Sequence, residues 1–411
     1  MERAAINRIR FSAAALALAA AALALIALPQ GAQAAFPGKP GKIAFNRDLM
    51  GTSIFTIAAN GSGTDPVTTD TAGVFDFSPS WHPLGRTLVF SRATGGTEEI
   101  FVVNADGSGQ DQLTTNAVID QFPSFSYDGR RIVFTRGGGT SEEIFVMNAN
   151  GSGQDQVTTN GVQDTNPRFT PDGRIVFEQG PPGNAEIAII KPNGSAFKQL
   201  TDNSVDDGYP GVSPDGRKVV FERGGMGEIF VMSINGSNQV QLTDNSDDDS
   251  DPAFAPNGSK IVFARTLPGN QEVFVMNADG SGQDRVTIND ASADYRPNWQ
   301  PIPVRCGGRR ATQVGTVGRD SLAGTARADV LAGLAGRDRL RGKRGRDRLC
   351  GLRGKDTLIG GAGGDKHFGG AGGDRLIGGR GKDSFNGGPG RDVCIGTRGE
   401  RFRGCEVIRL R

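Results

Sequence analysis

Nine aspartates recur at intervals of nine residues in the last quarter of the chain. They are Asp320, Asp329, Asp338, Asp347, Asp356, Asp365, Asp374, Asp383 and Asp392. Neither a helix nor a single strand has a nine-residue period, so the spacing predicts a row of stacked turns that each carry one carboxylate. Hard oxygen donors placed at such turns are the ligands that calcium prefers.

The formal charge is distributed unevenly along the chain. Residues 305–411 carry 24 Lys and Arg against 11 Asp and Glu, a net charge of +13, whereas residues 36–304 carry 19 against 33, a net charge of −14. This asymmetry is expected where a basic tail binds an anionic cell-surface polymer, or where the two parts attract each other. No aromatic residues alternate with the basic ones, so nucleic-acid binding is not expected.

Residues 1–35 have the pattern of an export signal. Three arginines precede an uninterrupted run of apolar and small residues over 11–28, and a small-x-small cleavage pattern follows at 32–34. An uncleaved membrane anchor is the alternative, because the run is about long enough to span a bilayer. With cleavage we expect a secreted, periplasmic or cell-surface protein without a transmembrane segment.

The four cysteines are Cys306, Cys350, Cys394 and Cys405. An even number of cysteines in an exported protein predicts two disulfides, although four cysteines allow three pairings. The short loop favours Cys394–Cys405, which leaves Cys306–Cys350. Zinc binding is the alternative, but the chain has no Cys-x-x-Cys motif and only two histidines.

Residues 36–304 contain a repeat of 42–44 residues. The glycines that mark it are Gly85, Gly129, Gly173, Gly216 and Gly258. Each repeat holds short apolar runs rich in β-branched and aromatic residues, separated by the Asp-Gly, Asn-Gly or Gly-Gly of tight turns. Four strands in a repeat of this length describe one blade of a β-propeller.

The second strand of the repeat occurs six times, which predicts six blades. Its copies begin at Ile43, Leu88, Ile132, Ile175, Val219 and Ile261. The first repeat lacks its opening strand, whereas an additional one follows the last repeat at 295–299. We expect this strand to complete the first blade, which leaves no long exposed sheet edge.

The repeat resembles that of TolB-type six-bladed propellers. Ser-Pro-Asp-Gly-Arg at 213–217 is followed by Glu-Ile-Phe-Val-Met at 228–232 and Gln-Leu-Thr at 241–243, and the resemblance covers about residues 37–301. It implies a protein-binding or ligand-binding platform on the face where the loops between blades gather. The arginines that end the second strands, such as Arg92 and Arg265, are expected to pair with glutamates that begin the third strands.

No catalytic residues are expected. The only histidines, His82 and His367, lack a nucleophile and an orienting acid by motif, and the chain has neither a nucleophile elbow nor His-Glu-x-x-His. The alternative is a secreted hydrolase or lyase that uses carboxylates in the propeller channel.

Four contiguous Gly-Gly-x-Gly-x-Asp motifs begin at Gly360, Gly369, Gly378 and Gly387. They resemble the RTX, or hemolysin-type, calcium-binding nonapeptide repeat over about residues 315–396. The resemblance implies a parallel β-roll in which two nonapeptides form one coil, so that aspartates eighteen residues apart share ions. The residue two positions after each aspartate is expected to point into an apolar core.

The candidate calcium ligands are aspartates and turn glycines of the later repeats. They are Asp347, Asp356, Gly361, Gly363, Asp365, Gly370, Gly372, Asp374, Gly379, Gly381, Asp383, Gly388, Gly390 and Asp392. In the first half, Leu334, Lys343 and Leu352 replace the second glycine, and flanking arginines such as Arg337 are expected to pair with the carboxylates. Coordination is therefore predicted mainly at the last four aspartates.

The sequence as a whole predicts an all-β protein, with a six-bladed β-propeller over 36–304 and a parallel β-roll over 305–411. Calcium is the one cofactor expected. A roll held by salt bridges and disulfides without metal is the alternative. The predicted function is that of an exported, non-enzymatic calcium-binding protein with an unidentified protein or surface ligand as its partner.

Overall fold

The computed structural model of the chain describes residues 41–138, 142–225, 227–288, 291–301, 304–315 and 319–410. Their regular structure consists of β-strands, which confirms the predicted all-β class. Within these ranges there is no helix long and apolar enough to cross a membrane. The predicted export signal, residues 1–35, lies outside the described residues.

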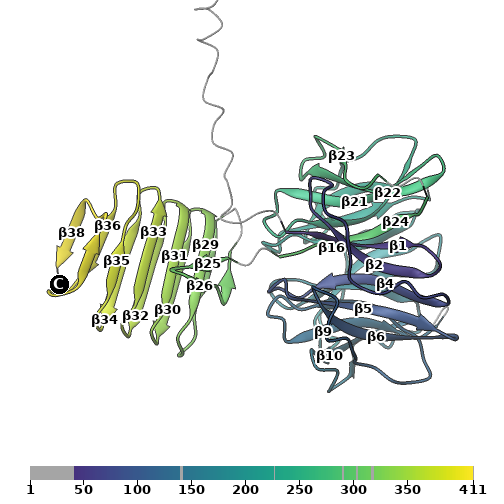
Figure 1. The fold of residues 1–411 in the computed structure, drawn as a ribbon, viewed down its shortest axis with the longest axis horizontal. Coiled ribbons are helices and arrows are strands. Elements are labelled where there is room, and N and C mark those ends of the chain that lie inside the picture. The colour runs from purple at the N-terminus through teal and green to yellow at the C-terminus, as the bar shows by residue number, and fades with distance from the viewer. Residues whose placement is uncertain are drawn as a thin grey trace, which may run out of the picture. The chain divides into compact units, whose positions relative to one another are not determined.

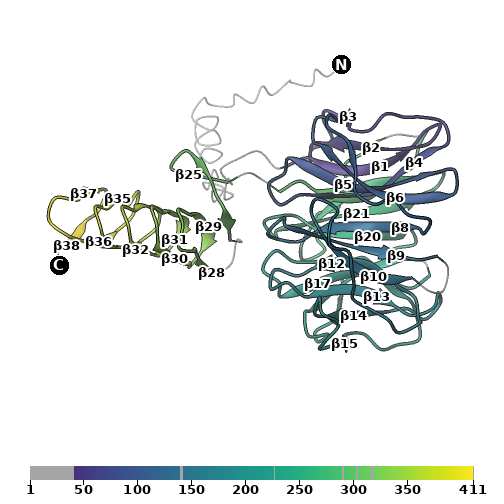
Figure 2. The ribbon, with the colours of Figure 1, turned by 90° about the horizontal axis from the view of Figure 1, so that it is seen from below.

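Residues 43–299 form groups of four antiparallel strands (Figure 1, Figure 2). The first group consists of β24 (Asp294–Trp299), β1 (Ile43–Asp48), β2 (Thr52–Ile57) and β3 (Asp65–Pro66). The second consists of β4 (Val74–Trp81), β5 (Thr87–Thr94), β6 (Thr97–Asn104) and β7 (Asp111–Gln112). The third consists of β8 (Asp120–Phe125), β9 (Arg131–Arg136), β10 (Glu143–Asn148) and β11 (Asp155–Gln156).

The remaining groups repeat this order. The fourth consists of β12 (Asp164–Phe169), β13 (Ile175–Gln179), β14 (Glu186–Ile190) and β15 (Lys198–Gln199). The fifth consists of β16 (Asp207–Val212), β17 (Lys218–Arg223), β18 (Glu228–Ser233) and β19 (Val240–Gln241). The last consists of β20 (Asp248–Phe254), β21 (Lys260–Leu267), β22 (Asn270–Asn277) and β23 (Asp284–Arg285). One parallel pair, Thr52–Phe75, joins the first two groups into a single sheet, so the count of six blades stays a prediction.

The strand at the end of the propeller completes its first group, as predicted. β24 runs antiparallel to β1, with Trp299 opposite Ile43 and Asp294 opposite Arg47. These backbone hydrogen bonds join segments about 250 residues apart in sequence, and they cover an edge of the first group that would otherwise be open to another chain.

The propeller core lies between successive groups of strands. One fully buried phenylalanine from each second strand occupies it: Phe45, Phe90, Phe134, Phe177, Phe221 and Phe263. Phe90, for example, clusters with Ala44 and Ile54 of the preceding group. Burying one such ring stabilises the fold by about 1.5–3 kcal/mol, and the repetition of the phenylalanine gives every interface between groups a similar core.

An arginine near the end of five second strands forms an ion pair with a buried aspartate. The pairs are Arg47–Asp294, Arg92–Asp76, Arg136–Asp120, Arg223–Asp207 and Arg265–Asp249. In the last of these, the arginine Nε and Nη2 donate to the two carboxylate oxygens at 2.5 and 2.7 Å. Its guanidinium also lies over the rings of Phe263 and Phe274.

The prediction that these arginines pair with third-strand glutamates is wrong. The innermost strand places a carboxylate opposite each guanidinium, where the planar fork of the arginine can bind both oxygens. The glutamates bind other partners, mostly in loops, and Glu272 pairs with Arg285 of β23. Glu99, for example, accepts hydrogen bonds from the backbone N–H and the side chain of Asn116.

We expect Arg265→Ala to lower the free energy of unfolding of the propeller by about 3–5 kcal/mol, because it leaves the fully buried Asp249 carboxylate without its partner. Arg174→Ala is the matched control. It removes the exposed pair with Asp172 and should cost no more than about 1 kcal/mol. Denaturant unfolding of both variants measures the difference, and equal costs would contradict a stabilising role for the buried pairs.

Residues 313–410 form two parallel six-stranded sheets (Figure 1, Figure 2). The first sheet consists of β27 (Gln313–Val314), β29 (Val330–Gly336), β31 (Arg348–Gly354), β33 (Lys366–Ala371), β35 (Ser384–Asn386) and β37 (Arg401–Arg403). The second consists of β28 (Ser321–Ala323), β30 (Arg339–Arg344), β32 (Thr357–Ala362), β34 (Arg375–Arg380), β36 (Val393–Gly396) and β38 (Val407–Leu410). The chain alternates between the sheets, so two nonapeptides form one coil of a parallel solenoid of about five turns.

Both predicted disulfides are present, Cys306–Cys350 and Cys394–Cys405. The first closes a loop of 44 residues, and loop closure of this length corresponds to a stabilisation of about 4 kcal/mol. The second links β36 to the segment that precedes β38, at the C-terminal end of the solenoid.

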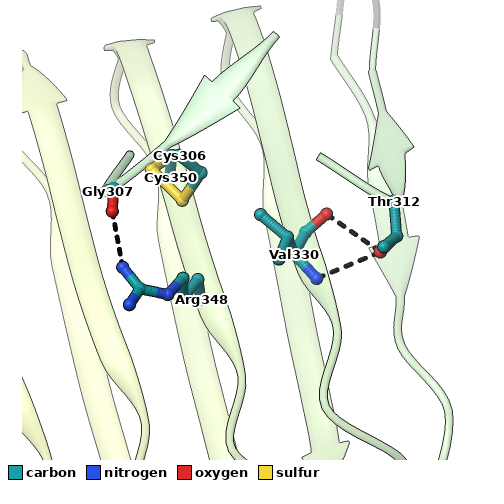
Figure 3. The surroundings of a disulfide bond; sticks show 6 residues. All are labelled: Cys306, Gly307, Thr312, Val330, Arg348 and Cys350. Carbon is teal, nitrogen blue, oxygen red and sulfur yellow. Dashed lines mark hydrogen bonds between the residues drawn. A yellow bond between two sulfur atoms is a disulfide. The ribbon is translucent and has the colours of Figure 1, made fainter. Parts of the chain in front are cut away.

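A short hairpin, β25 (Arg305–Cys306) and β26 (Arg309–Arg310), lies over the first sheet at the Cys306–Cys350 disulfide (Figure 3). Arg348 Nη1 donates a hydrogen bond to the Gly307 carbonyl oxygen at 2.6 Å. The hairpin covers apolar side chains of β29 and β31 that would otherwise face solvent. The disulfide therefore fixes a cover on the first coils of the solenoid.

Candidate calcium-binding ladder

The turns between the two sheets have backbone angles that explain the glycine pattern. The third glycine of the motif has φ between 112° and 146° from Gly336 to Gly390, a range that is strongly unfavourable for residues with a Cβ. The second position has φ between 77° and 80° where Leu334, Lys343 and Leu352 occupy it. That left-handed conformation costs an ordinary residue roughly 1–2 kcal/mol, so the second glycine can be replaced at moderate cost.

The aspartates form two hydrogen-bonded ladders along the edges of the solenoid. Oδ1 of each accepting aspartate binds the backbone N–H of the aspartate eighteen residues earlier, at 2.7–2.9 Å. The accepting residues are Asp338, Asp347, Asp356, Asp365, Asp374, Asp383 and Asp392. The expectation that aspartates eighteen residues apart lie on the same edge is therefore confirmed.

The second carboxylate oxygen of these seven aspartates is buried and has no hydrogen-bond partner. Each of the seven is at most 3% exposed. Burial raises the pKa of Asp338 and Asp356 to about 7, and that of Asp365 and Asp374 to about 6, against the lowering effect of the backbone N–H bond. The ladders therefore contain carboxyl groups that are unfavourable as bare anions.

Backbone carbonyl oxygens lie in the same turns as these carboxylate oxygens. At Gly360, the first glycine of its motif, an added Cβ would meet both Oδ2 of Asp365 and the carbonyl oxygen of Gly378 in the next coil. The predicted ligand glycines are in the same turns. The carbonyl oxygen of Gly363, for example, faces Gly381 one coil further on.

This arrangement fits a hard cation. Among the described residues no three His, Cys, Asp or Glu side chains gather as a metal cluster, so an ion here would take its protein ligands from a few carboxylates and from backbone carbonyls. Calcium accepts six to eight oxygen ligands of these two kinds in flexible geometry. Softer metals prefer thiolates and imidazoles. The ladders consist of aspartates, and the cysteines are paired in disulfides, so neither kind of ligand contributes to them.

Asp329 differs from the other rungs. Its Oδ2 accepts hydrogen bonds from the backbone N–H of Thr325 at 2.6 Å and from the Thr325 hydroxyl at 2.9 Å. A side chain at the second-glycine position thus satisfies the oxygen that is unpaired at the later rungs. The prediction that coordination is concentrated at the last four aspartates stays a prediction, because the rungs from Asp338 onward share one geometry.

The predicted pairing of ladder carboxylates with flanking arginines is wrong for the described residues. All salt bridges among them lie within residues 42–294. Arg337 and Arg339 are exposed, whereas the intervening Asp338 side chain is buried. The two arginines therefore face solvent, while the aspartate between them is buried in the turn that joins β29 to β30.

Two glutamates end the ladders, and the sequence pattern did not reveal them. Glu400 Oε1 accepts a hydrogen bond from the Asp383 backbone N–H at 3.3 Å, and Glu406 Oε2 accepts one from that of Asp392 at 2.7 Å. The spacing shortens at these last turns, so the nine-residue period misses both residues. They follow the last aspartate of each ladder by 17 and 14 residues, and this approach to the eighteen-residue spacing was the available signal.

The predicted inward-pointing residues form the core of the solenoid. Leu331, Leu340, Leu349 and Leu358 make one buried cluster, and Leu376, Phe385 and Cys394 make another. His367 occupies the equivalent position between them and stacks on Phe385 with ring centroids 4.9 Å apart. Burial lowers its pKa to about 4, so it is a neutral core residue at pH 7.

A second group of unusual residues lies on the innermost strands of the propeller. In each group, the residue before the proline of the innermost strand has φ between 50° and 55°: Ser78, Phe122, Asn166, Tyr209, Asp251 and Arg296. Arg296 Nη1 donates to Ser78 Oγ at 2.9 Å and its guanidinium lies over Phe122. These contacts join several blades at the bulges, and they include no nucleophile with an adjacent base.

Comparisons with known proteins agree with both halves of this description. The chain matches the TolB beta propeller domain over residues 42–245 and 208–303. It matches the RTX calcium-binding nonapeptide repeat (4 copies) over residues 314–349, 333–366 and 368–401. No curated protein matches the chain.

Three solved structures show the breadth of the fold. TolB of Acinetobacter baumannii is 22% identical with a TM-score of 0.57, over 64% of this chain and 68% of that chain. Hydrazine synthase of Kuenenia stuttgartiensis is 17% identical with a TM-score of 0.56, over 66% and 48%. A chain of a nidogen/laminin complex is 11% identical with a TM-score of 0.54, over 63% and 98%.

At these identities the solved structures show the fold alone, whereas the family match covers more than half of the chain. The TolB-like propeller and the two disulfides indicate a periplasmic or extracellular protein. The chain belongs to the TolB β-propeller domain family, and RTX calcium-binding nonapeptide repeats follow its propeller.

Proposed function

We propose that this is an exported, non-enzymatic protein whose ladder binds calcium and whose propeller is a platform for a partner. The observation that carries the calcium part is the buried, unpartnered Oδ2 that recurs at seven successive rungs. Both matched families are non-catalytic, which supports the non-enzymatic role. Extracellular calcium modules work at dissociation constants of about 10⁻⁴–10⁻³ M, the range in which we expect these sites.

We expect Asp365→Asn to weaken calcium binding and to reduce the number of ions bound, because the amide removes a charged oxygen from the ladder. Asp329→Asn is the matched control, since Thr325 already satisfies Oδ2 of that aspartate. Calorimetric titration of the full chain with calcium should show a loss of at least about tenfold in affinity, or about 1.4 kcal/mol, for the first variant only.

Two results would contradict the calcium assignment. One is a wild-type chain that takes up no calcium at millimolar concentrations. The other is an equal effect of the two substitutions, which would mean that the unpartnered oxygens are not the ligands.

The platform part rests on an exposed apolar row in the loops between blades. Val118, Val162 and Val205 are 40–44% exposed at equivalent places in successive loops. In each loop an asparagine side chain, such as that of Asn160, accepts the backbone N–H of the valine at 2.7–3.0 Å and fixes the turn. Single exposed apolar side chains are common on protein surfaces, but three at equivalent places in successive loops lie on the same face of the propeller, where one partner can contact all of them.

The platform is tested by partner capture with a surface variant. We expect Val118→Ser/Val162→Ser/Val205→Ser to keep the wild-type unfolding temperature and to lose a protein that wild type crosslinks in its native envelope. Phe197→Ser/Val240→Ser, which removes exposed apolar residues elsewhere on the propeller, is the control. A partner retained by the valine variant would rule out this face as the platform.

A further inference from the structure

We propose that the outer face of the second solenoid sheet binds an acidic polysaccharide. The surface in question, here named the basic face, consists of the exposed residues Arg339, Arg341, Arg344, Arg375 and Arg380 on β30 and β34. The proposal goes beyond calcium binding and beyond the propeller platform, and it rests on where the solenoid places its charges.

The solenoid separates its two kinds of charge. Residues 305–411 contain 11 acidic residues, nine ladder aspartates and the two glutamates that end the ladders. The aspartates from Asp329 to Asp392 are at most 8% exposed. The 24 Lys and Arg of the same residues thus have almost no carboxylate beside them at the surface, and no described one forms a salt bridge.

This separation makes the surface more basic than the net charge of +13 indicates. Carboxylates that are buried, and neutralised there by protons or by cations, contribute little to the field outside. Two alternatives to polymer binding were open from the sequence, namely pairing with the ladder and mutual attraction of the two parts of the chain. The first is removed because the ladder aspartates from Asp329 onward are buried and no described Lys or Arg of the solenoid forms a salt bridge with them.

The register of the sheet arranges the arginines in rows. Arg339, Thr357 and Arg375 are partners across β30, β32 and β34, and so are Arg344, Ala362 and Arg380. Since neighbouring strands are about 4.8 Å apart, the arginines of one row lie about 10 Å apart with a small residue between them. An extended polymer with acidic groups at intervals could bind several guanidinium groups at once.

The chemistry of the face favours an acidic polysaccharide over a nucleic acid. Guanidinium groups bind carboxylate and sulfate oxygens in pairs. Single-stranded nucleic acids also need aromatic rings on which bases stack. The described rings of the solenoid are engaged elsewhere: Phe385 stacks on His367 and Phe402, and Phe368 packs below the hairpin at Gly307.

Binding of the full chain to heparin and to polygalacturonate, in saturating calcium, tests the proposal. We expect Arg339→Ser/Arg341→Ser/Arg375→Ser to weaken binding by at least about tenfold and to reduce the dependence of log affinity on log salt by about two. The matched control, Arg130→Ser/Arg217→Ser/Lys218→Ser, removes three exposed charges from the propeller and should bind within about twofold of wild type.

A charge-conserving variant separates charge from folding. Arg339→Lys/Arg341→Lys/Arg375→Lys keeps the charges but not the paired guanidinium donors, so it should lose less binding than the serine variant. If the calcium titration shows that the serine variant does not fold, the polysaccharide binding of Arg344→Ser/Arg380→Ser is compared with that of wild type instead. Three results would overturn the proposal. The first is equal polysaccharide binding by wild type and the serine variants, and the second is an equal loss of binding in the lysine and serine variants. The third is tighter binding of single-stranded DNA than of either polysaccharide.

Discussion

Gly372→Ala should abolish the ordered solenoid while the propeller stays folded. Gly372 has φ 133°, a conformation that disfavours any residue with a Cβ. An added Cβ would also overlap the carbonyl oxygen of Gly354 in the preceding coil. No side-chain rotation can relieve this overlap, because the carbonyl oxygen and the Cα that carries the new Cβ belong to the backbones of adjacent coils. We therefore expect the substitution to cost more than about 4 kcal/mol of stability.

The adjacent glycine is the matched control for that substitution. Gly373 does not have a positive φ, and a Cβ added there would come no closer than 3.2 Å, to the carbonyl oxygen of Arg391. Gly373→Ala should therefore change stability by about 1 kcal/mol or less. Limited proteolysis with mass spectrometry separates the two outcomes: cleavage over residues 319–410 in Gly372→Ala alone supports the stacked-turn geometry, and equal resistance of both variants contradicts it.

Periodicity in the sequence predicted the parts of the fold that repeat. The repeat of 42–44 residues placed the strands of the propeller, including β24 beside β1, because turn residues and alternating apolar positions are local properties. The nine-residue period placed the aspartates on the two edges of the solenoid in the same way. The inward leucines followed from their fixed distance to each aspartate.

The side-chain contacts made across neighbouring strands were not predictable from the repeat. Arg92 and Glu99 face each other across a hairpin, yet the arginine binds Asp76 on the inner strand, where both its donors are satisfied. The ends of the ladders at Glu400 and Glu406 depend on turns that break the period. The positive φ at residues such as Asp251 arises at bulges between strands, which the local sequence marks only by the following proline.

The solenoid should lose stability in the absence of calcium as the pH rises from about 4 to 7. The folded-state pKa values of Asp338 and Asp356 are about 7 and those of Asp365 and Asp374 about 6, all above the ordinary value of 3.8. In that window the folded solenoid therefore binds more protons than the unfolded chain, and its free energy of unfolding falls with increasing pH. One pKa unit corresponds to about 1.4 kcal/mol for each group, so even a part of these shifts, summed over the four groups, amounts to a loss of several kcal/mol.

Calcium should reverse this loss, because it replaces the protons at the buried oxygens. We expect the calcium-free solenoid to unfold at a lower temperature at pH 8 than at pH 5, and calcium to raise that temperature more at pH 8 than at pH 5. Calorimetry of the full chain, stripped of metal by dialysis, measures both differences against the propeller transition as an internal reference. Asp365→Asn/Asp374→Asn should flatten the pH dependence, because an amide neither binds a proton in this range nor carries a charge. A calcium-free solenoid that becomes more stable between pH 5 and 8 would show that the buried carboxyl groups are not the source of the calcium requirement.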